Sequence, residues 1–303
     1  MKKILVVGSI NMDLLVSTDE IPRPGETVMG NDLSQIPGGK GANQAVAMSK
    51  LNSDVTFLGK IGNDPFGETL LTSMKNSGVD TSYIEEDGET TGIAVINVDK
   101  DGNNNIVVIA GSNWKVDNDY LERNEKAFEE SDVVVFQLEI PIETVKTGLK
   151  MAKDLGKTTI LNPAPASDLD DETIRNIDIF IPNEHELARM AGVEVKDKDS
   201  MLKAAKLLLG KGIKEIIVTL GSQGILYVNK ETHKFIDSYH VKVVDTTAAG
   251  DSFIGGFTTS YIEDGSIEKA IDLGQRTAAL SIQKLGAQSS IPSREEVNNF
   301  KAQ

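Results

Sequence analysis

The sequence predicts an α/β protein whose main sheet is mostly parallel and covered by helices on both sides, with a small β-sheet beside it. Two observations support this prediction. From about residue 112 onward, apolar β-branched runs alternate with helical segments, which is typical of a doubly covered parallel sheet. Residues 14–36 and 91–110 instead contain extended segments without helices among them, which indicates a separate small sheet.

The first half of the chain starts with "KKILVVGSI", in which a β-branched apolar run, Ile4 to Val7, ends in Gly8. Two lysines before an apolar run resemble a signal peptide, but the run is short and Asp13 follows without a small-residue cleavage site, so a buried strand is the better interpretation. Residues 41–51 predict a helix, residues 54–62 a strand, and residues 66–77 a helix that ends at Gly78. "IAVINV" and "IVVIA" flank the polar turn "DKDGNNN" and predict a hairpin.

The second half alternates regularly between the two element types. The predicted helices are residues 118–130, 143–155, 184–192 and 200–212, followed by two closing helices after residue 248. The predicted strands are residues 132–138, 157–162, 177–183, 214–221, 224–229 and 234–244. Ligands of parallel sheets bind beyond the carboxyl ends of the strands. The polar residues at those ends are Asn11, Asp13, Glu139, Asn162, Asn183, Thr219 and Asp245.

Composition excludes several classes of protein. The 303 residues include no cysteine, so disulfides, thiolate metal sites and cysteine nucleophiles are excluded, and a reducing cytosol is expected. The net charge of −15 repels nucleic acid and anionic lipid, so neither is an expected partner. No stretch approaches the roughly 18 apolar residues of a membrane span. Because the negative net charge also repels ATP-like anions, any phosphate site must be built locally, from backbone amides, a few cations and bound metal.

Several common catalytic motifs are missing. The chain has no G-x-x-x-x-G-K-[ST] phosphate loop and no G-x-G-x-x-G after its first strand. His185-Glu186 lacks the second histidine of a zinc-binding helix, and "TLGSQG" has Leu220 where a nucleophile elbow needs glycine. Zinc, serine-nucleophile and dinucleotide chemistry are therefore unsupported.

Two motifs near the N-terminus are candidate binding elements. In "GSINMD" (8–13), Asn11 and Asp13 lie two residues apart and share one face of an extended segment, where they can hold vicinal hydroxyls. In "GGKGANQA" (38–45), glycines allow close approach of the backbone, while Lys40 and Asn43 supply polar groups. The alternative in each case is an ordinary turn or helix cap.

Three further motifs follow strands of the second half: "NPAPA" (162–166), "PNEHE" (182–186) and "TLGSQG" (219–224). Asn183 and Glu186 suit a water-bound magnesium, but the same spacing also predicts a capping box, and the pattern alone favours the cap. Thr219 and the turn that follows it suit a nucleotide, and the alternative is a plain hairpin.

"DTTAAGDSF" (245–253) is the most informative stretch. Ala248, Ala249 and Gly250 leave backbone amides open to an anion, and a helix that starts there adds its positive end. Asp251 in the first turn can take a proton from a substrate hydroxyl, while the amides hold charge on a transferring phosphoryl group. The alternative is an acidic first turn worth about 0.5 kcal/mol.

Taken together, "GSINMD", "GGKGANQA", "QLE" (137–139), "NPAPA", "PNE", "TLGSQG", "DTTAAGD" and "KLGAQSSIP" resemble the PfkB family of sugar kinases, also called the ribokinase family. The resemblance covers essentially the whole chain. It implies a large domain of residues 1–12, 43–91 and 110–303, and a small β lid of residues 13–42 and 92–109.

The resemblance also implies the roles of individual residues. Asp251 would deprotonate the sugar 5-hydroxyl, and the amides of Ala248, Ala249, Gly250 and Asp251 would form an anion hole. Asp251 would share the sugar site with Asn11, Asp13, Gly39, Lys40, Asn43 and Glu139. The nucleotide site would comprise Asn183, Thr219, Gly221, Ser222, Gly224, Gly250 and Gln275. Glu186 would act on Mg²⁺ indirectly.

Within the family, "GSINMD" and "GGKGANQA" resemble the members that phosphorylate D-ribose with ATP at the 5-hydroxyl. Other sugars or nucleosides, among them deoxyribose, fructose and adenosine, remain alternatives, as does a non-catalytic sugar sensor, which the retained Asp251 disfavours. The resemblance further implies a cytoplasmic homodimer joined through its lids, acting in D-ribose catabolism. A monovalent cation, K⁺, would be bound by Asp245, Thr247 and the backbone carbonyls of Ile282, Leu285, Ala287 and Ile291.

Overall fold

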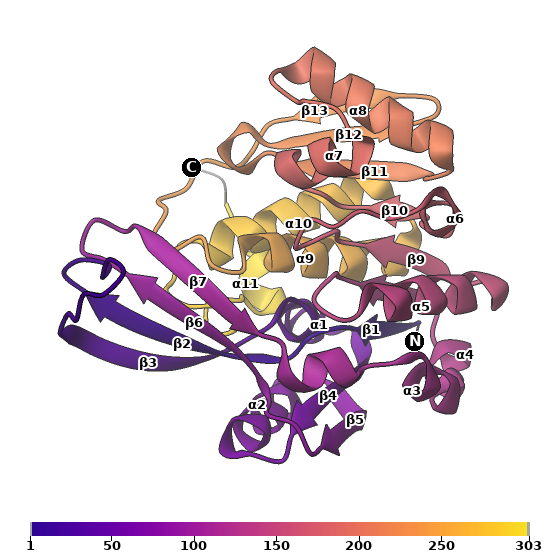
Figure 1. The fold of residues 1–303 in the computed structure, drawn as a ribbon. Helices are drawn as coiled ribbons and strands as arrows, with labels where there is room; N and C mark the ends of the chain where they lie inside the picture. The colour runs from indigo at the N-terminus through magenta and orange to yellow at the C-terminus, as the bar shows by residue number, and fades with distance from the viewer. Residues whose placement is uncertain (1, 302–303) are drawn as a thin grey trace.

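A large sheet forms the centre of the computed structural model, which describes residues 2–301 (Figure 1). Its strand order is β13-β12-β11-β10-β9-β8-β1-β4-β5. Neighbouring strands are parallel from β11 through to β5, whereas β12 pairs antiparallel with both β11 and β13. The strands are β1 (Lys3–Val7), β4 (Asp54–Gly62), β5 (Asp80–Asp87), β8 (Val133–Phe136), β9 (Thr158–Leu161), β10 (Ile179–Phe180), β11 (Glu215–Thr219), β12 (Ile225–Asn229) and β13 (His233–Ile236).

Helices cover both faces of this sheet. One face carries α3 (Asn118–Arg123), α4 (Glu125–Glu130), α5 (Ile142–Asp154), α6 (Asp171–Ile174), α7 (Glu184–Ala191) and α8 (Lys198–Lys211). The other face carries α1 (Lys40–Lys50), α2 (Pro65–Asn76), α9 (Ala249–Asp264) and α10 (Ile267–Ser281), and α11 (Arg294–Asn298) follows α10.

Strand alternation explains the two cores. Leu5 and Val7 of β1 pack into the cluster under α5, while Ile4 and Val6 pack into the cluster under α1 and α9. All four are fully buried, because a strand covered on both faces buries successive side chains on opposite sides. This is why the predicted parallel strands are continuous apolar runs.

A four-stranded sheet projects from the large layer, to the left in Figure 1. Its order is β3-β2-β6-β7, with β2 (Asn11–Thr18), β3 (Gly30–Gly38), β6 (Gly92–Val98) and β7 (Asn104–Ile109). We call this small sheet the lid. The predicted fold class is confirmed, and β6 and β7 form the predicted hairpin. The domain boundaries drawn from the sequence stay a prediction, and residues 1, 302 and 303 of the predicted large domain lie outside the described residues.

Three of the predicted elements differ in the structure, and β5 and α6 were not predicted. The helix predicted over 118–130 is broken at Asn124 into α3 and α4. The strand predicted over 177–183 is reduced to β10, followed by a single bridge between Asn183 and Thr219. The strand predicted over 234–244 is wrong beyond Ile236, since β13 is the last strand of the sheet and the chain leaves it there to line a cavity instead.

Two 3-10 turns, η1 (Gly111–Lys115) and η2 (Gly221–Gln223), complete the fold. Among residues 2–301, no helix combines the length and the apolar character that crossing a membrane requires.

Candidate active site

The first half of the site is built where α1 starts beside the end of β1. Gly39 has a φ of 88°, and a Cβ atom there would lie 2.7 Å from the amide nitrogen of Asn11. A Cβ atom on Gly41 would lie 2.6 Å from the amide nitrogen of Ser9. Gly39 and Gly41 of "GGKG" are therefore required by close backbone approach, which places α1 directly against the segment that carries Asn11 and Asp13.

The amides at the start of α1 are occupied by the chain itself. The Lys40 amide donates to Glu139 Oε2 (3.0 Å), the Gly41 amide to Ser9 Oγ (3.3 Å), and the Ala42 amide to the Ser9 carbonyl (2.9 Å). Ser9 Oγ donates in turn to Glu139 Oε2 (2.6 Å). The amides of the glycine-rich turn therefore already have acceptors within the protein, and α1 can contact a ligand only through its side chains.

Four charged side chains interact across this part of the site: Asp13, Lys40, Glu139 and Asp251. Burial, together with the charges of Glu139 and Asp251, raises the pKa of Asp13 to about 7, against a smaller opposing effect of Lys40. Burial acts to lower the pKa of Lys40, but the surrounding carboxylates, chiefly Asp251 and Glu139, outweigh it and hold that pKa above its usual value. A lysine therefore balances an excess of carboxylates in a largely buried region.

Asn11 is held by a residue that sequence reasoning did not single out. Asn113, on η1, donates from Nδ2 to Asn11 Oδ1 (2.7 Å) and to the Ile10 carbonyl (3.1 Å), and its Oδ1 accepts from the Ile10 amide (2.9 Å). Since Oδ1 of Asn11 is used in this way, its Nδ2 group is the one left to donate to a ligand. The only signal in the sequence was an asparagine just after the predicted hairpin.

Asp251 lies at the junction of α1 and α9. Its side chain is buried, with 8% of the residue exposed. Asn43 Nδ2 donates to Asp251 Oδ2 (3.1 Å), and Gln44 Nε2 donates to Asp251 Oδ1 (3.0 Å). The remaining oxygen of the Asn43 amide is buried and finds no hydrogen-bond partner among the described residues. An orphaned acceptor beside a carboxylate suits a ligand that carries hydroxyl donors.

The start of α9 is the opposite of the start of α1. Ala248 has a φ of 58°, the left-handed region that non-glycine residues seldom adopt. The amide of Ala249 donates to the Thr246 carbonyl and that of Ser252 to the Ala248 carbonyl. Between them, the amides of Gly250 and Asp251 find no acceptor within the part of the chain described. Two free amides at the positive end of a sixteen-residue helix form a local anion site in an otherwise acidic protein.

A cavity of about 480 Å³ opens next to these amides. It contains most of the residues predicted for the nucleotide, since Thr219, Gly221, Ser222, Gly224, Gly250 and Gln275 all line it. The segment after β13 adds a wall that the sequence did not predict, including Tyr239 and His240. The volume is ample for a heterocyclic ligand, and its end at Gly250 brings such a ligand to the anion site.

Asn183 is outside the lining of that cavity as described. It forms a complete capping box at the start of α7: its Oδ1 accepts from the Glu186 amide (2.9 Å), and Glu186 Oε2 accepts from the Asn183 amide (2.8 Å). Asn183 Nδ2 also donates to Glu186 Oε1 (2.9 Å). The capping alternative that the sequence pattern favoured is therefore present, and burial raises the pKa of Glu186.

Asp245 and the loop of residues 282–291 meet beside α9. Asp245 Oδ1 accepts from the amide (2.8 Å) and the hydroxyl (2.6 Å) of Thr247, and Oδ2 accepts from the Gly286 amide (2.9 Å). Partial burial acts to raise the pKa of Asp245, but these hydrogen bonds outweigh it and hold the pKa below its usual value. An ionised carboxylate is therefore fixed against the loop.

The four loop carbonyls expected to face a cation already accept hydrogen bonds. That of Ile282 accepts from the Val244 and Asp245 amides, that of Leu285 from Ser289 Oγ, and that of Ala287 from Ser290. The Ile291 carbonyl accepts from the ammonium group of Lys50 (3.0 Å), which also donates to the Gln288 carbonyl (2.8 Å). Across residues 2–301, the carbonyls of Lys284, Gly286 and Ser290 receive no such bond.

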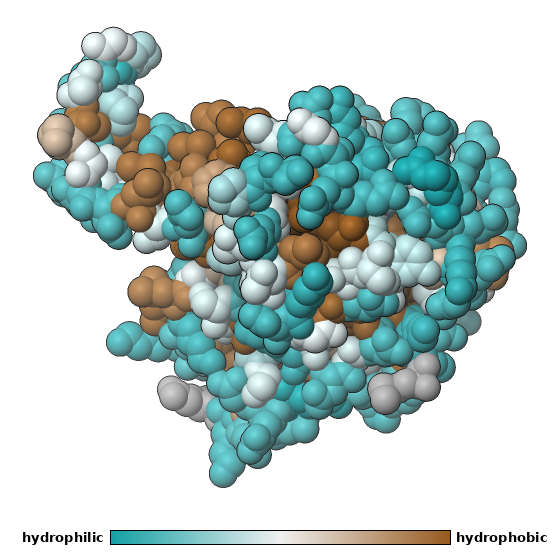
Figure 2. All heavy atoms as spheres, turned by 90° about the horizontal axis from the view of Figure 1, so that it is seen from below, coloured by the Kyte–Doolittle hydropathy of each residue, from teal (hydrophilic) through white to brown (hydrophobic). Residues whose placement is uncertain are grey.

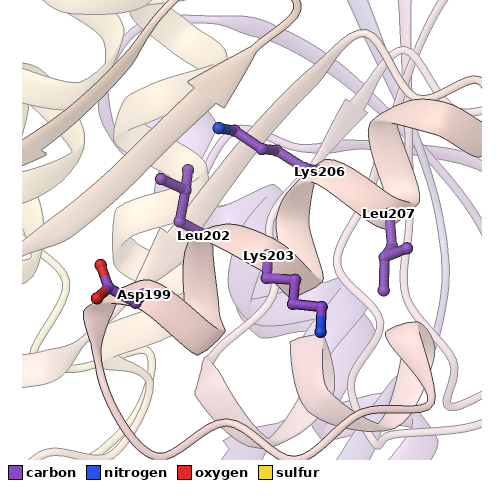
Figure 3. Close-up of a pocket in the computed structure, with 5 residues that line it drawn as sticks. All are labelled: Asp199, Leu202, Lys203, Lys206 and Leu207. Atoms are coloured by element: carbon purple, nitrogen blue, oxygen red, sulfur yellow. The ribbon is translucent and has the colours of Figure 1, made fainter.

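A further hollow, of about 320 Å³, lies on the outer side of α8 (Figure 3). Five residues of this one helix line it: Asp199, Leu202, Lys203, Lys206 and Leu207. Their polar ends do not converge on a common point in Figure 3, and none of them belongs to the polar groups of the site described above. It is a surface depression without a constellation of chemical groups.

A doubly covered parallel sheet, a projecting β lid, and a buried carboxylate beside free amides and a large cavity define a class of α/β phosphotransferases. The family model of the pfkB family carbohydrate kinases matches residues 1–294, and the chain belongs to that family.

Individual relatives match over their whole length. The chain is 42% identical over 300 residues to a ribokinase of Haemophilus influenzae, covering 99% of this chain and 98% of the relative. It is 37% identical over 299 residues to a deoxyribokinase of Salmonella typhi, covering 98% of each. Among solved structures, a ribokinase of Arabidopsis thaliana complexed with ribose and ATP matches with a TM-score of 0.92 at 30% identity, covering 99% of this chain and 100% of that one.

Proposed function

We propose that this protein is a ribokinase, which transfers the γ-phosphoryl group of ATP to the 5-hydroxyl of D-ribose to give D-ribose 5-phosphate and ADP. Full-length similarity to the Haemophilus ribokinase, and to the Arabidopsis ribokinase that binds ribose and ATP, supports this activity. The observation that carries the proposal is the position of Asp251, one residue after Gly250 of the nucleotide-sized cavity and in contact with Asn43 on α1, the helix that also carries Lys40.

In the proposed reaction, Asp251 is the base. A carboxylate offers about four lone-pair sites, and two accept from Asn43 and Gln44, which leaves others for the proton of the sugar 5-hydroxyl. The hydroxyl oxygen attacks the γ-phosphorus, the bond to the β-γ bridging oxygen breaks, and ADP leaves. The free amides of Gly250 and Asp251 would hold the charge on the transferring group. Ala248 and Ala249 complete the predicted anion hole, but the Ala249 amide already donates to the Thr246 carbonyl.

The sugar would bind among the polar side chains around the start of α1, which come from Asn11, Asp13, Lys40, Asn43 and Glu139. Asn11 offers an amide donor and Asp13 a carboxyl group, and they lie on one strand, β2, at the alternation that suits vicinal hydroxyls. Lys40, Asn43 and Glu139 complete the set, and Gly39 allows the backbone to approach. The orphaned Asn43 oxygen supports this assignment, because a sugar hydroxyl would donate to it. The nucleotide would occupy the cavity, with Thr219, Gly221, Ser222, Gly224 and Gln275 around it.

Magnesium would reach the phosphates through water held by Glu186. The capping box uses one site on each oxygen of that carboxylate and leaves the others free for ordered water, so the residue fits an indirect role. When bound, the ion would neutralise phosphate charge. Asn183 would serve by keeping Glu186 in place.

A monovalent cation, K⁺, would bind between Asp245, Thr247 and the loop of residues 282–291. The ionised Asp245 carboxylate against the loop supports a cation there. A carbonyl that accepts one hydrogen bond keeps a second lone pair, so Ile282, Leu285, Ala287 and Ile291 still fit. Ile291 is the weakest of them, because the Lys50 ammonium already donates to its oxygen and would repel a second cation. The neighbouring carbonyls of Lys284, Gly286 and Ser290 accept no hydrogen bond from the described residues. When bound, the ion would contribute positive charge near the anion site.

A homodimer through the lid is also proposed. β7 is exposed along its whole length, and Figure 2 shows apolar side chains gathered along the projecting sheet at the left. Exposed apolar residues lie at both edges of the lid: Met29, just before β3, and Leu33 at one edge, and Ile106, Val107, Val108 and Ile109 of β7 at the other. The apolar edge that β7 forms calls for a partner surface. Sedimentation should give a dimer for the protein and a monomer for Val107→Lys, and a monomeric parent protein would refute the pairing. A cytoplasmic location and a place in ribose catabolism stay predictions.

The test of the activity is coupled ATP turnover over a panel of D-ribose, deoxyribose, fructose and adenosine, with Mg²⁺ present and with K⁺ or Na⁺. We expect the highest kcat/KM for D-ribose and stimulation by K⁺. Deoxyribose is the second candidate, because a deoxyribokinase matches this chain at 37% identity. A clear preference for fructose or adenosine, or turnover that is independent of any sugar, would overturn the proposal.

A further inference from the structure

Behind Asp251 lies a chain of buried amide side chains that the reaction as described does not use. We propose that Gln137 and Gln44 form a relay that orients the carboxylate of Asp251, which makes both glutamines positioning residues for the proton-accepting step. The inference rests on the proposed function, in which Asp251 is the base.

The relay consists of direct hydrogen bonds between side chains that are shielded from solvent. Gln137 Nε2 donates to Gln44 Oε1 at 2.6 Å, and Gln44 Nε2 donates to Asp251 Oδ1 at 3.0 Å and to Asn162 Oδ1 at 3.3 Å. Gln44 and Gln137 both have 0% of their surface exposed, so water does not compete for these bonds. Gln44 is on α1, Gln137 follows β8, Asn162 follows β9 and Asp251 is on α9, so the relay joins four elements at the ligand edge of the sheet.

The direction of every amide in the relay follows from one backbone group. Asn162 Nδ2 donates to the Ile181 carbonyl (2.9 Å), which can only accept, and this leaves Asn162 Oδ1 facing Gln44. Gln44 must therefore present its NH₂ group on that side, toward Asn162 and Asp251 alike, and its oxygen toward Gln137. Gln137 must then donate to that oxygen. The far oxygen of Gln137 is left buried without a partner in the part of the molecule described.

The Gln137 oxygen is unsatisfied because the amide is oriented to donate to Gln44. A buried carbonyl oxygen without a partner costs about 1–3 kcal/mol, and the opposite orientation of Gln137 would satisfy it no better while breaking its bond to Gln44. A Cβ atom on Gly8 would lie 2.1 Å from Gln137 Oε1, so the glycine at the end of β1 provides the room for this amide. The unpaired Gln137 oxygen is thus the energetic cost of keeping Gln137 Nε2 directed at Gln44 Oε1.

The consequence is a carboxylate that cannot rotate freely. Asn43 holds Asp251 Oδ2 and Gln44 holds Oδ1, so the plane of the carboxylate is set by α1 from both sides. Asn43 can also meet the sugar, but Gln44 has both ends of its amide engaged within the protein. Its contribution is therefore to the orientation of the base and not to sugar binding.

The test compares turnover with binding in four proteins: the parent, Gln44→Met, Gln137→Met and the double variant. Misplacing a reacting group by about 1 Å can cost about 100-fold in rate, so we expect kcat to fall about 100-fold for Gln44→Met and about tenfold for Gln137→Met. The Kd for D-ribose, measured by calorimetry, should stay within about twofold. The double variant should be no slower than Gln44→Met, since Gln137 acts through Gln44.

The same substitutions in an Asp251→Asn background separate the two proposals. With the base removed, Gln44→Met and Gln137→Met should cause no further loss of the residual turnover. Multiplicative losses, in that background or in the double variant, would overturn the relay, as would a parent-like kcat for Gln44→Met. Full activity of Asp251→Asn by itself would instead overturn the proposed base.

A matched control accounts for damage to packing. Thr144→Val also deletes one buried hydrogen bond, from Thr144 Oγ1 to the Val116 carbonyl (2.7 Å), outside the site, and should leave kcat unchanged. If Gln44→Met fails to fold, Gln137→Met still decides the question, because it leaves every contact of Asp251 in place. A loss of kcat at constant Kd supports the relay, and an unchanged kcat overturns it.

Discussion

Two helices start at the site, and their starts are built in opposite ways. The first amides of α1 are all taken up by Ser9, Gly39 and Glu139, whereas α9 leaves the amides of Gly250 and Asp251 without acceptors in the described chain. Gly39 and Gly41 at the start of α1 are required by neighbouring backbone, whereas Gly250 at the start of α9 faces open space. A glycine-rich turn is therefore no guide to an anion site by itself. What matters is whether the fold leaves the amides free.

The largest expected effect comes from removing the carboxylate at the start of α9. Asp251→Asn keeps the shape of the side chain but cannot take a proton, and general bases contribute about 10²–10⁴-fold. We expect kcat to fall by that factor with near-parental thermal stability. Steady-state kinetics and a melting curve measure the two properties. Retained activity would refute the base, and an unfolded variant would show that Asp251 acts only as a residue of the first helical turn.

A pair of glycine substitutions tests the comparison of the two helix starts directly. A Cβ atom on Gly250 meets nothing within 4 Å in the chain, so Gly250→Ala should fold normally and crowd only the phosphoryl group. Loss of one anion-hole contact costs about 100-fold in kcat, which we expect here.

Gly41→Ala should do the reverse. Its Cβ atom would meet backbone atoms of Ser9 and Gly8 at 2.6 and 2.8 Å, and overpacking of this kind costs about 1–3 kcal/mol of unfolding free energy. Denaturant unfolding of both variants checks this. The contrast between the helix starts would be refuted if Gly250→Ala lost as much stability as Gly41→Ala.

A smaller effect is expected at the proposed cation site beside α9. Asp245→Asn removes the fixed charge, and we expect about tenfold more K⁺ to be needed for half-maximal activation, equivalent to about 1.4 kcal/mol. Titration of activity with K⁺ measures this. Asp264→Asn is a matched control, because Asp264 also accepts from the amide two residues later, that of Ser266, but lies at the far end of α9. Equal shifts in both variants would argue against a site at Asp245.

The smallest effect is a pH dependence on the α1 side. The pKa of Asp13 is raised from 3.8 to about 7 by burial and by the charges of Glu139 and Asp251, with Lys40 opposing. The folded protein therefore binds this proton more tightly than the unfolded chain, and Asp13 makes the unfolding free energy fall as pH rises from about 4 to about 7. Relative to the parent, Asp13→Asn should gain stability progressively as pH rises from about 4 to about 7. Parallel pH profiles in denaturant unfolding would contradict this.

Much of the fold was predictable because its signals are local. Alternating apolar runs predicted the doubly covered sheet, "DKDGNNN" between apolar runs predicted the β6–β7 hairpin, and Gly78 and Gly192 mark helix ends as expected. The capping box of Asn183 and Glu186 was also among the alternatives, since it joins residues three apart. The strand predicted over 234–244 failed because apolar alternation shows only that one face is covered, and here a cavity wall replaces a neighbouring strand.

The site divides in the same way. By itself the sequence determined which segments carry reactive groups, because glycine turns, helix starts and strand ends are written within a few residues of one another. Only the tertiary structure decided which groups meet. Gln44 contacts Asp251 across 207 positions and Gln137 across 93, and Asn113 contacts Asn11 across 102. Such contacts depend on how the two helix layers pack on the sheet, and no local pattern of residues records that packing.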